Sequence, residues 1–295
     1  MLVLHKIDEI KAVVSQEKAK NKTIGFVPTM GALHQGHISL IDYSKKETDI
    51  TVCSIFVNPT QFNNQSDLKH YPRTPEADIK LLEDAGCDIL YMPEVSDVYP
   101  ENDIRKFDFG YLDTVLEGAT RPGHFNGVGQ VVSILLEGVK PDKAYFGSKD
   151  YQQVMVVKSL VKQLKLPVEI IPCPILREPD GLAMSSRNTR LSAEERKIAA
   201  FIPQWMQEAI VIVKEKGITA AKQFINEKVS KVPEMKLDYY EVCDAETLES
   251  ISDIKSITLS ACLVGRQGVE RHQKAISLIA LFVGNIRLID NWMIE

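Results

Sequence analysis

The first half of the chain alternates short apolar runs with segments in which apolar residues recur at helical spacing, and this alternation restricts the fold more than any other feature. Strands that are apolar along their whole length are typical of a parallel sheet covered by helices on both faces. The apolar runs are residues 23–27, 50–57, 89–92 and 144–146, and the helical segments are residues 38–47, 75–84 and 127–139. We therefore predict an α/β fold with a Rossmann-like, doubly wound parallel sheet, in which ligands bind beyond the carboxyl ends of the strands.

A smaller C-terminal domain is predicted to follow this sheet. Residues 171–175 form a proline-rich strand end, and a turn follows at Pro179-Asp180-Gly181. We therefore assign residues 1–178 to the first domain and residues 179–295 to the second, a division that suits a chain of 295 residues.

The second domain is predicted to be of the α+β type. Ser192 and Glu195 form a capping-box pattern for a helix that runs to about Lys216, and a second helix follows from about Thr219. Strands are expected at residues 237–242, 276–283 and 286–289.

The charge and the apolar pattern argue against several classes of protein. The formal net charge is -5 at pH 7, whereas a nucleic-acid surface needs a concentrated field of Lys and Arg. The segment from Met1 to Lys6 does not resemble a secretory h-region, and no apolar run reaches the roughly 18 residues that span a bilayer. We expect a cytoplasmic protein that binds neither nucleic acid nor membranes.

The cysteines are odd in number, widely spaced and without a Cys-x-x-Cys pair. Each lies within or beside an apolar run, so we expect buried, reduced thiols. They are Cys53, Cys87, Cys173, Cys243 and Cys262.

The strongest local feature is the segment Pro28 to His37, between the first predicted strand of this sheet and a helix. Gly31 and Gly36 allow a ligand close to the backbone, the helix N-terminus offers N–H groups, and His34 and His37 can donate to phosphate oxygens. An isolated His-x-x-His is equally consistent with a polar turn whose histidines cap the helix. Zinc is a third possibility, for which the sequence supplies no further ligands at usable spacing.

Two later segments have compatible chemistry. After residues 144–146, Lys149 can meet phosphate charge and Asp150 can accept from ribose hydroxyls. At the domain boundary, Ser185 and Ser186 precede Arg187, a combination that suits a mobile phosphate clamp. Each segment alone is also consistent with an ordinary solvated turn. Convergence of all three on one cleft favours a nucleotide site.

A pocket for a small carboxylate is predicted after residues 50–57, where Asn58 and Gln61 stand beside aromatic residues. Arg121 and His124 could also contact substrate, although a structural turn with a helix cap is at least as consistent with them. We interpret residues 71–75 as a loop and helix start. We interpret Arg287 and Asp290, near the C-terminus, as salt-bridged structural residues.

The order and spacing of these motifs resemble the pantoate–β-alanine ligase (pantothenate synthetase) family over essentially the whole chain. The resemblance implies a Rossmann-like domain, a smaller C-terminal lid domain and a homodimer. It also implies kinship with the nucleotidyltransferases related to class I aminoacyl-tRNA synthetases, whose His-x-Gly-His motif resembles residues 34–37. The motifs that carry the resemblance are Pro28-Thr29-Met30-Gly31 and residues 54–59, 116–118, 121–125, 180–183, 185–188 and 287–291.

The reaction implied by the resemblance has two steps and uses Mg-ATP, pantoate and β-alanine. Pantoate attacks the α-phosphorus of ATP to give pantoyl adenylate and pyrophosphate, and β-alanine then attacks the acyl carbon to give pantothenate and AMP. An ionised carboxylate needs no base, so the enzyme chiefly aligns the reactants and stabilises phosphoryl charge. We expect Mg²⁺ to be carried by the triphosphate, with no ligands from the protein.

The resemblance also implies roles for individual residues. The catalytic set is His34, His37, Lys149 and Arg187, with His37 as proton donor. Gln61, Gln153 and Asn58 are assigned to pantoate and β-alanine, and the Leu176 backbone to adenine. The ATP-binding residues are Met30, Gly31, Ala32, Leu33, His34, Gln35, Gly36, His37, Gly147, Ser148, Lys149, Asp150, Leu176, Met184, Ser185, Ser186 and Arg187.

The sequence departs from related patterns at two places. Ser148 stands where this family usually has Glu. Residues 183–187 lack both lysines of the synthetases' Lys-Met-Ser-Lys-Ser motif, so we expect Lys149 and Arg187 to share that cationic role. Two rival interpretations stay open: a nucleotidyltransferase that acts on another acceptor, and a nucleotide-binding regulatory module without turnover.

Overall fold

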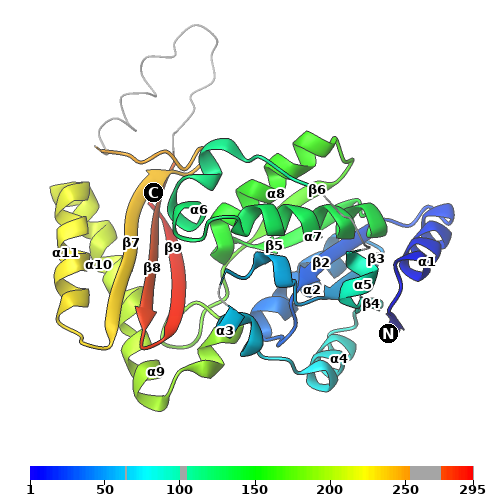
Figure 1. Ribbon diagram of the computed structural model, residues 1–295, viewed down its shortest axis with the longest axis horizontal. Helices are drawn as coiled ribbons and strands as arrows, with labels where there is room; N and C mark the ends of the chain where they lie inside the picture. Colours follow the sequence, from blue (N-terminus) through cyan, green and yellow to red (C-terminus); the bar gives the residue numbers. More distant parts are fainter. Residues whose placement is uncertain (64, 100–104, 253–273, 295) are drawn as a thin grey trace, which may run out of the picture. The chain divides into compact units, whose positions relative to one another are not determined.

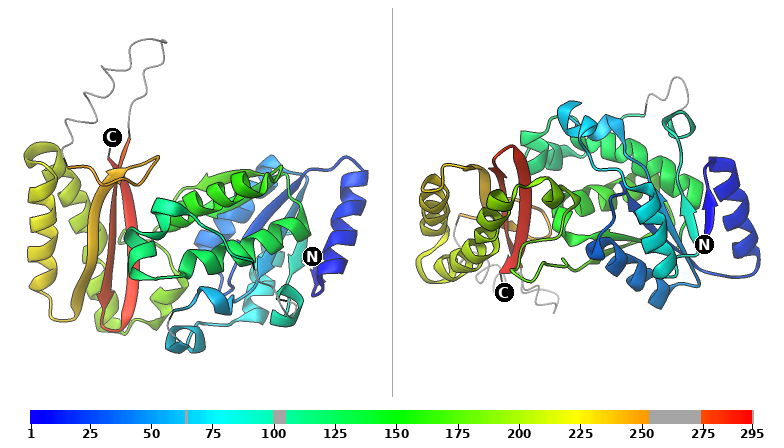
Figure 2. Two further views of the ribbon diagram at one scale, coloured as in Figure 1. Left: turned by 45° about the horizontal axis from the view of Figure 1, so that its top comes forward. Right: turned by 90° about the horizontal axis from the view of Figure 1, so that it is seen from below.

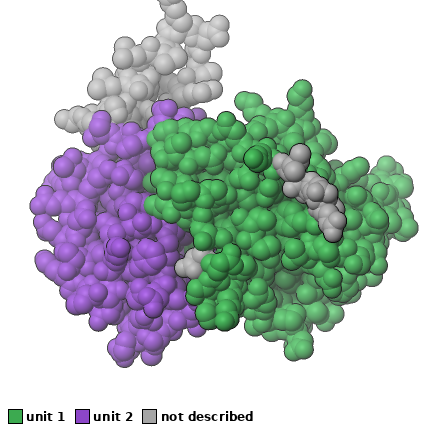
Figure 3. All heavy atoms as spheres, in the orientation of Figure 1, with its two compact units in different colours: residues 1–176, 184–186 green, residues 177–183, 187–295 purple. Residues whose placement is uncertain are grey.

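The computed structural model describes residues 1–63, 65–99, 105–252 and 274–294, and Figure 1 labels its elements. The chain divides into two compact units, shown in green and purple in Figure 3. Unit 1 consists of Met1–Leu176 and Met184–Ser186, and unit 2 of Arg177–Ala183 and Arg187–Glu295. The chain therefore leaves unit 1 after Leu176, returns for three residues and leaves again after Ser186.

A six-stranded sheet in which all neighbours are parallel lies at the centre of unit 1, in the order β1-β4-β3-β2-β5-β6. From β2 the chain builds β3 and β4 on one side, and then crosses to the other side for β5 and β6. The switch point between β2 and β5 is where open α/β sheets bind ligands. The predicted doubly wound α/β fold is confirmed. The strands are β1 (Leu2–Leu4), β2 (Ile24–Thr29), β3 (Ile50–Ile55), β4 (Ile89–Tyr91), β5 (Lys143–Gly147) and β6 (Glu169–Cys173).

Both faces of this sheet are buried, because successive residues of a strand point to opposite faces. Phe26 of β2 belongs to the apolar core that contains residues of α1, α7 and α8. Val27 belongs to a second core, formed with α2 and α4. Figure 1 shows α7 and α8 side by side. The helices are α1 (Ile7–Ala19), α2 (Gln35–Glu47), α4 (Pro75–Asp84), α7 (His124–Val139) and α8 (Tyr151–Leu164).

The first turns of two helices differ from the prediction. Helix α2 begins at Gln35 instead of residue 38, and α7 begins at His124 instead of residue 127. Polar residues and glycine dominate these turns, so the apolar spacing does not reveal them. Strand β1 and helix α1 have no counterpart among the predicted elements. The shorter elements of unit 1 are α3 (Gln65–Lys69), α5 (Val95–Val98), α6 (Leu116–Thr120), η1 (Pro59–Gln61), η2 (Gly110–Asp113) and η3 (Ser148–Asp150).

Unit 2 contains an antiparallel sheet of three strands in the order β7-β8-β9, with α10 and α11 beside it (Figure 2). The predicted strands are present and extend further. Residues of α10, α11 and all three strands share one apolar core. The elements are η4 (Ser186–Arg190), α9 (Ala193–Ala199), α10 (Phe201–Lys216), α11 (Ile218–Ser230), β7 (Met235–Asp244), β8 (Ala275–Val283) and β9 (Ile286–Ile294).

The single helix predicted from Ser192 to about Lys216 is two helices, α9 and α10. The predicted capping box is present, since Ser192 Oγ accepts from Glu195 N and Glu195 Oε2 accepts from Ser192 N. The first helix nevertheless ends at Ala199. A continuous helix would direct the N–H of residue 203 to the Ala199 carbonyl, and Pro203 has no N–H.

The described cysteines Cys53, Cys87, Cys173 and Cys243 are free and buried, as predicted, whereas Cys262 lies outside the described residues. Burial raises the pKa of the Cys87 thiol to about 12, so this thiol is un-ionised at neutral pH. Within the described part of the chain, no helix combines the length and apolar character that crossing a membrane requires.

Candidate active site

Three segments meet in unit 1 beyond the carboxyl ends of its strands. The segments after β2 and β5 leave strands that are direct neighbours. Ser186 is buried and donates its hydroxyl hydrogen to the Ala32 carbonyl at 3.0 Å. A Cβ atom added to Gly36 would lie 3.5 Å from Met184 Cβ. Residues 30–37, 147–150 and 184–186 are therefore brought together by the fold.

The turn after β2 is held by a carboxylate that the sequence did not single out. Gly31 has φ +80° and Ala32 has φ +49°, a left-handed conformation that costs an alanine about 1–2 kcal/mol. Asp78 Oδ2 accepts from Ala32 N at 2.9 Å, and Asp78 Oδ1 accepts from Leu33 N at 2.8 Å. These two hydrogen bonds help to stabilise the strained turn.

One sequence signal could have revealed Asp78. In α4 it lies four residues before Leu82, so both residues are on the same face of the helix, and both are buried. An acidic residue on the apolar face of a helix rarely stays buried without a specific partner. The partners themselves lie 45 and 46 residues away in the sequence.

The two histidines lie next to each other at the start of α2, with their ring planes tilted by 39°. His34 is the N-cap residue, and its Nδ1 accepts from Gly36 N at 3.1 Å. His37 Nδ1 accepts from His34 N at 3.3 Å, and the ring centroids are 4.0 Å apart. Because each Nδ1 accepts a hydrogen bond, the proton of each neutral ring lies on Nε2. The helix-capping alternative is thus confirmed, and capping occupies only one nitrogen of each ring.

Both rings are neutral at physiological pH. Burial and, next, the Lys149 charge lower the pKa of His34 from 6.5 to about 4. Burial, the neighbouring His34 and Lys149 lower the pKa of His37 to about 3. Desolvation and nearby positive charge both disfavour an imidazolium. The rings therefore offer Nε2–H groups as uncharged hydrogen-bond donors.

The backbone N–H groups of residues 31–34, before α2, and Gly36 N within its first turn, already have hydrogen-bond partners in the chain. Gly31 N donates to Thr29 Oγ1 at 3.2 Å, and the next N–H groups are taken by Asp78 and by the two rings. Polar side chains satisfy these donors locally, as buried backbone groups require. The imidazole Nε2–H groups, rather than these backbone groups, are therefore the donors that a ligand can use.

The segment after β5 supplies a cation close to the histidines. Lys149 and Asp150 lie in the 3-10 turn η3 that follows Gly147, with Lys149 Nζ 3.9 Å from Asp150 Oδ2. Only 18% of the Lys149 side chain is exposed, against 49% for Asp150. Gln153 is half-buried in the first turn of α8. Partial burial of Lys149 strengthens its field toward a bound anion.

The two amides predicted for substrate binding have different surroundings. Asn58 is 1% exposed, and its Nδ2 donates to Gln61 Oε1 and to the Gly127 carbonyl. Its Oδ1 accepts from Tyr99 Oη at 2.7 Å. Gln61 Nε2 lies 2.8 Å from Sδ of Met30, the first residue of the segment 30–37 that contains the two histidines. The geometry gives Asn58 a supporting role and brings Gln61 to the site.

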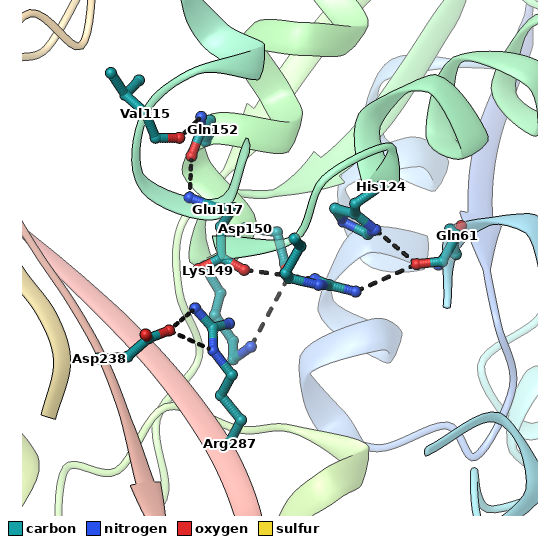
Figure 4. Close-up of polar contacts among 10 residues, drawn as sticks. Gln61, Val115, Glu117, His124, Lys149, Asp150, Gln152, Asp238 and Arg287 are labelled. Atoms are coloured by element: carbon teal, nitrogen blue, oxygen red, sulfur yellow. Dashed lines mark hydrogen bonds and ion pairs between the residues drawn. The ribbon is translucent and has the colours of Figure 1, made fainter. Parts of the chain in front are cut away.

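Arg121 and His124 hold the Gln61 segment through its backbone, and Figure 4 shows the contact of His124 with Gln61. His124 Nδ1 donates to the Gln61 carbonyl at 2.8 Å, and Arg121 Nη2 donates to the same oxygen at 3.4 Å. His124 is also the first residue of α7, which therefore begins three residues before the predicted start at residue 127. Burial and, next, the Arg121 charge lower the pKa of His124 to about 4.

Gln152 is a second buried residue that sequence reasoning missed. Its Nε2 donates to the Leu112 carbonyl at 2.8 Å. Figure 4 shows its other contacts: Nε2 donates to the Val115 carbonyl, and Oε1 accepts from Glu117 N at 3.0 Å. Glu117 in turn pairs with Arg121 at 3.4 Å. The local sequence does not show which of Gln152 and Gln153 is structural. The two differ in their hydrogen bonds, and those of Gln152 go to residues 35 to 40 positions earlier in the chain.

The segment predicted as a phosphate clamp passes from one unit to the other. The Leu176 carbonyl accepts from Met184 N at 3.1 Å in unit 1, whereas Arg187 belongs to unit 2. Ser185 lies between Met184 and the buried Ser186.

The two C-terminal residues interpreted as structural are indeed salt-bridged. Arg177 Nη1 and Nη2 lie 2.7 and 2.9 Å from the two oxygens of Asp290, whose side chain is 1% exposed. Arg287 pairs with Asp238 at 2.7 Å (Figure 4). A bidentate, buried pair fixes the segment that begins at Arg177 onto β9.

Among the described residues, no three His, Cys, Asp or Glu side chains are grouped so that they could hold a metal ion. In the zinc interpretation His34 and His37 would be ligands. Their Nδ1 atoms accept backbone hydrogen bonds, so only the Nε2 atom of each ring would be left as a ligand.

A parallel sheet with neutral histidines and a lysine at its switch point is the arrangement of a nucleotide-binding α/β enzyme. A family model described as pantoate-beta-alanine ligase matches residues 2–293. Proteins named pantothenate synthetase from Bacteroides fragilis and Porphyromonas gingivalis are 45% and 46% identical over 291 residues, which cover 99% of this chain and 98% of each relative.

Solved structures agree with these relatives. The pantothenate synthetase of Thermus thermophilus is 38% identical with a TM-score of 0.86, and the match covers 99% of both chains. The pantoate-beta-alanine ligase of Francisella tularensis, complexed with "Beta-gamma ATP" and β-alanine, is 35% identical with a TM-score of 0.78 and covers 99% of this chain and 97% of that one.

The chain belongs to the pantoate-beta-alanine ligase family. It is a ligase, and the reaction of its family is the ATP-dependent condensation of pantoate with β-alanine, which yields pantothenate.

Proposed function

We propose that the chain carries out this condensation in two steps beyond the carboxyl ends of β2 and β5. A pantoate carboxylate oxygen attacks the α-phosphorus of ATP, and the bond to the pyrophosphate oxygen breaks. The amine of β-alanine then attacks the acyl carbon of pantoyl adenylate, AMP leaves, and the amine releases a proton. The observation that carries the proposal is the grouping of two imidazole Nε2–H donors with the Lys149 ammonium.

Hydrogen bonding and charge stabilisation account for the first step. Pantoate is ionised at neutral pH, so no base is needed, and negative charge spreads over the phosphoryl oxygens in the transition state. Lys149 supplies positive charge, and His34 and His37 donate hydrogen bonds. With a pKa of about 3, His37 acts as a neutral donor and not as an imidazolium acid. This replaces the proton-donor role that the family resemblance implies.

We assign the ligand contacts as follows. Residues 30–37 and 147–150 bind ATP, with the Leu176 backbone at adenine, and Met184, Ser185, Ser186 and Arg187 close over the phosphates. Gln61 and Gln153 hold pantoate, and Gln61 also borders the β-alanine position. Support comes from the Gln61–Met30 contact and from the Ser186–Ala32 hydrogen bond, which join these segments. Asn58 contributes by fixing the Gln61 amide.

Mg²⁺ is proposed to enter with ATP. The described residues offer no group of three or more His, Cys, Asp or Glu side chains as a ligand set. Phosphate oxygens and water are the ligands that this ion prefers. Bound there, Mg²⁺ would offset part of the triphosphate charge, and the protein contributes Lys149 and the two imidazoles.

At a larger scale, we propose that residues 1–178 form the ATP- and pantoate-binding domain and residues 179–295 a lid domain. Residues 184–186 belong to unit 1 and Arg187 to unit 2, which supports a link between the proposed phosphate clamp and the second domain. A cytoplasmic homodimer is proposed from the family resemblance alone. Sedimentation equilibrium of the purified chain tests the dimer, and a mass near 33.1 kDa would contradict it.

Pantoate-dependent exchange of labelled pyrophosphate into ATP, without β-alanine, tests the two-step proposal. Reversible adenylation predicts exchange that requires pantoate. Exchange driven by a different acid would support a nucleotidyltransferase with another acceptor. ATP binding without any exchange would support a regulatory module.

A further inference from the structure

Asp78 is a buried carboxylate whose partners all belong to the site or its border. It is 1% exposed on α4 and accepts hydrogen bonds from Ala32 N, Leu33 N and Thr74 Oγ1 at 2.9, 2.8 and 3.0 Å. Burying a carboxylate is unfavourable unless its oxygens are well satisfied, so this contact set is specific. Two of the three donors are successive backbone groups of the strained turn.

The turn that Asp78 holds determines where the candidate phosphate donors stand. Leu33 directly precedes His34, which caps α2 and whose N–H fixes the ring of His37. Both backbone polar groups of Ala32 are hydrogen-bonded: its N–H donates to Asp78, and its carbonyl accepts from Ser186. A shift of this turn would therefore move both imidazoles and the Ser186 contact together.

We propose that Asp78 is a positioning residue for the adenylation step, acting through the Gly31–Leu33 turn. The proposal rests on the two-step function above. A carboxylate suits this place because both of its oxygens accept hydrogen bonds from N–H groups. An asparagine would turn an NH₂ group toward one of them, which leaves two donors facing each other.

The test compares Asp78→Asn with a matched control, Asp142→Asn. Asp142 Oδ2 accepts from Ile24 N at 2.7 Å and Oδ1 accepts from Lys18 Nζ at 3.1 Å, at the opposite end of β2. Both variants lose a carboxylate that accepts from the backbone of the same strand or its turn. Pantoate-dependent pyrophosphate exchange is measured per folded molecule, well below each melting temperature.

Asp78→Asn is expected to lower kcat for exchange by roughly 10–100-fold, since misplaced donors weaken transition-state stabilisation. The KM for β-alanine and the rate of the second step with supplied pantoyl adenylate should change little. Asp142→Asn should lower the melting temperature and leave exchange within about twofold of wild type. This split between the two half-reactions would not arise from a purely structural role.

Four outcomes are distinguished. Exchange by Asp78→Asn at the wild-type rate would overturn the proposal, as would an equal loss in both half-reactions. If Asp78→Asn does not fold, Thr74→Val removes one partner of Oδ1 and should slow exchange about threefold; a wild-type rate would again overturn it. Absence of exchange in the wild-type chain would instead refute the two-step function.

Discussion

The two ends of strand β2 use the same chemistry for different purposes. At the amino end, Asp49 and Asp142 accept hydrogen bonds from Thr23 N and Ile24 N, and both carboxylates are at least partly exposed. At the carboxyl end, Asp78 is buried and holds a turn with positive φ at Gly31 and Ala32. The first arrangement only fixes the amino end of a central strand. The second holds a turn whose backbone conformation is strained.

The charges at the two ends differ as well. Asp142 pairs with Lys18 at 3.1 Å, so positive and negative charge are matched at the amino end. At the carboxyl end, Lys149 lies 3.9 Å from Asp150, and burial together with the Lys149 charge lowers the pKa of His34 and His37. Strained turns and strongly shifted pKa values cluster at functional sites, and the carboxyl end of β2 combines the positive φ of Ala32 with histidine pKa values of about 4 and 3. The comparison indicates where chemistry takes place within a uniformly well-packed sheet.

The largest effect is expected from removing the cation or a donor at the carboxyl end. Lys149→Ala or His37→Ala should lower adenylation by roughly 10²–10⁴-fold, because each removes a charge-stabilising group while the core stays intact. Single-turnover formation of pyrophosphate measures this rate. Lys18→Ala, which removes a cation at the amino end, is the control and should be nearly neutral. Wild-type-like turnover in either site variant would contradict the assigned roles.

A more selective effect is expected at the Gln61 amide. Gln61→Ala should raise the KM for pantoate by roughly 10-fold or more and that for ATP much less, since a lost hydrogen bond costs affinity mainly for its own ligand. Initial-rate kinetics with each substrate varied in turn would show the split. Asn63→Ala, which removes a side chain that donates to the Pro122 carbonyl, serves as a nearby control. Equal losses for pantoate and ATP would argue against the assignment.

The pH dependence should distinguish neutral imidazoles from an imidazolium acid. Since the pKa of His34 is about 4 and that of His37 about 3, exchange should show no loss with a pKa near 6.5 as pH rises from about 6 to 8. A profile with an inflection near 6.5 that His37→Gln abolishes would refute the neutral-donor role.

The same shifts predict a dependence of stability on pH. In the unfolded chain these rings take up protons below about pH 6.5, whereas the folded rings stay neutral until pH 4 or 3. Stability is therefore present above about pH 6.5 and is lost as pH falls toward the folded pKa values. Urea titrations at several pH values should show that the free energy of unfolding depends less on pH in His34→Gln than in the wild-type chain. An unchanged slope would contradict the burial of this ring.

The smallest effect is expected at the amino end. Hydrogen bonds from Thr23 N and then Thr23 Oγ1 lower the pKa of Asp49, so its contribution to stability is present above about pH 4 and is lost at lower pH. Asp49→Asn should lower the melting temperature slightly at pH 7 and progressively less as the pH falls below the unfolded pKa, with exchange within about twofold of wild type. A large loss of exchange in Asp49→Asn would contradict the proposal that only the carboxyl end of β2 takes part in the reaction.

The sequence predicts the central strands of the parallel sheet because they are continuous apolar runs, and it predicts their covering helices because these have an apolar period. It does not reveal β1 and α1. The segments that follow β2 and β5 are also predictable, since a motif placed after a strand must lie at the carboxyl edge. Gln35 and His124 mark where this reasoning fails, because the polar first turns of α2 and α7 have no apolar period.

Side-chain roles are less predictable, because they depend on contacts between distant parts of the chain. Asp78 finds its partners 45 and 46 residues away, and Gln152 binds a segment 35 to 40 residues earlier. Asn58 illustrates a further difficulty. Its amide side chain and its position after β3 suit a ligand contact. In the structure, however, its Nδ2 donates to Gln61 and Gly127.

Transfer of an isotopic label tests the central claim most directly. Pantoate with oxygen-18 in its carboxylate is incubated with ATP, β-alanine and the wild-type chain, and the products are analysed by mass spectrometry. Attack on the α-phosphorus predicts one labelled oxygen in the phosphate of each AMP formed, and none in pyrophosphate. Unlabelled AMP, with the label in pyrophosphate or phosphate, would contradict the pantoyl-adenylate route.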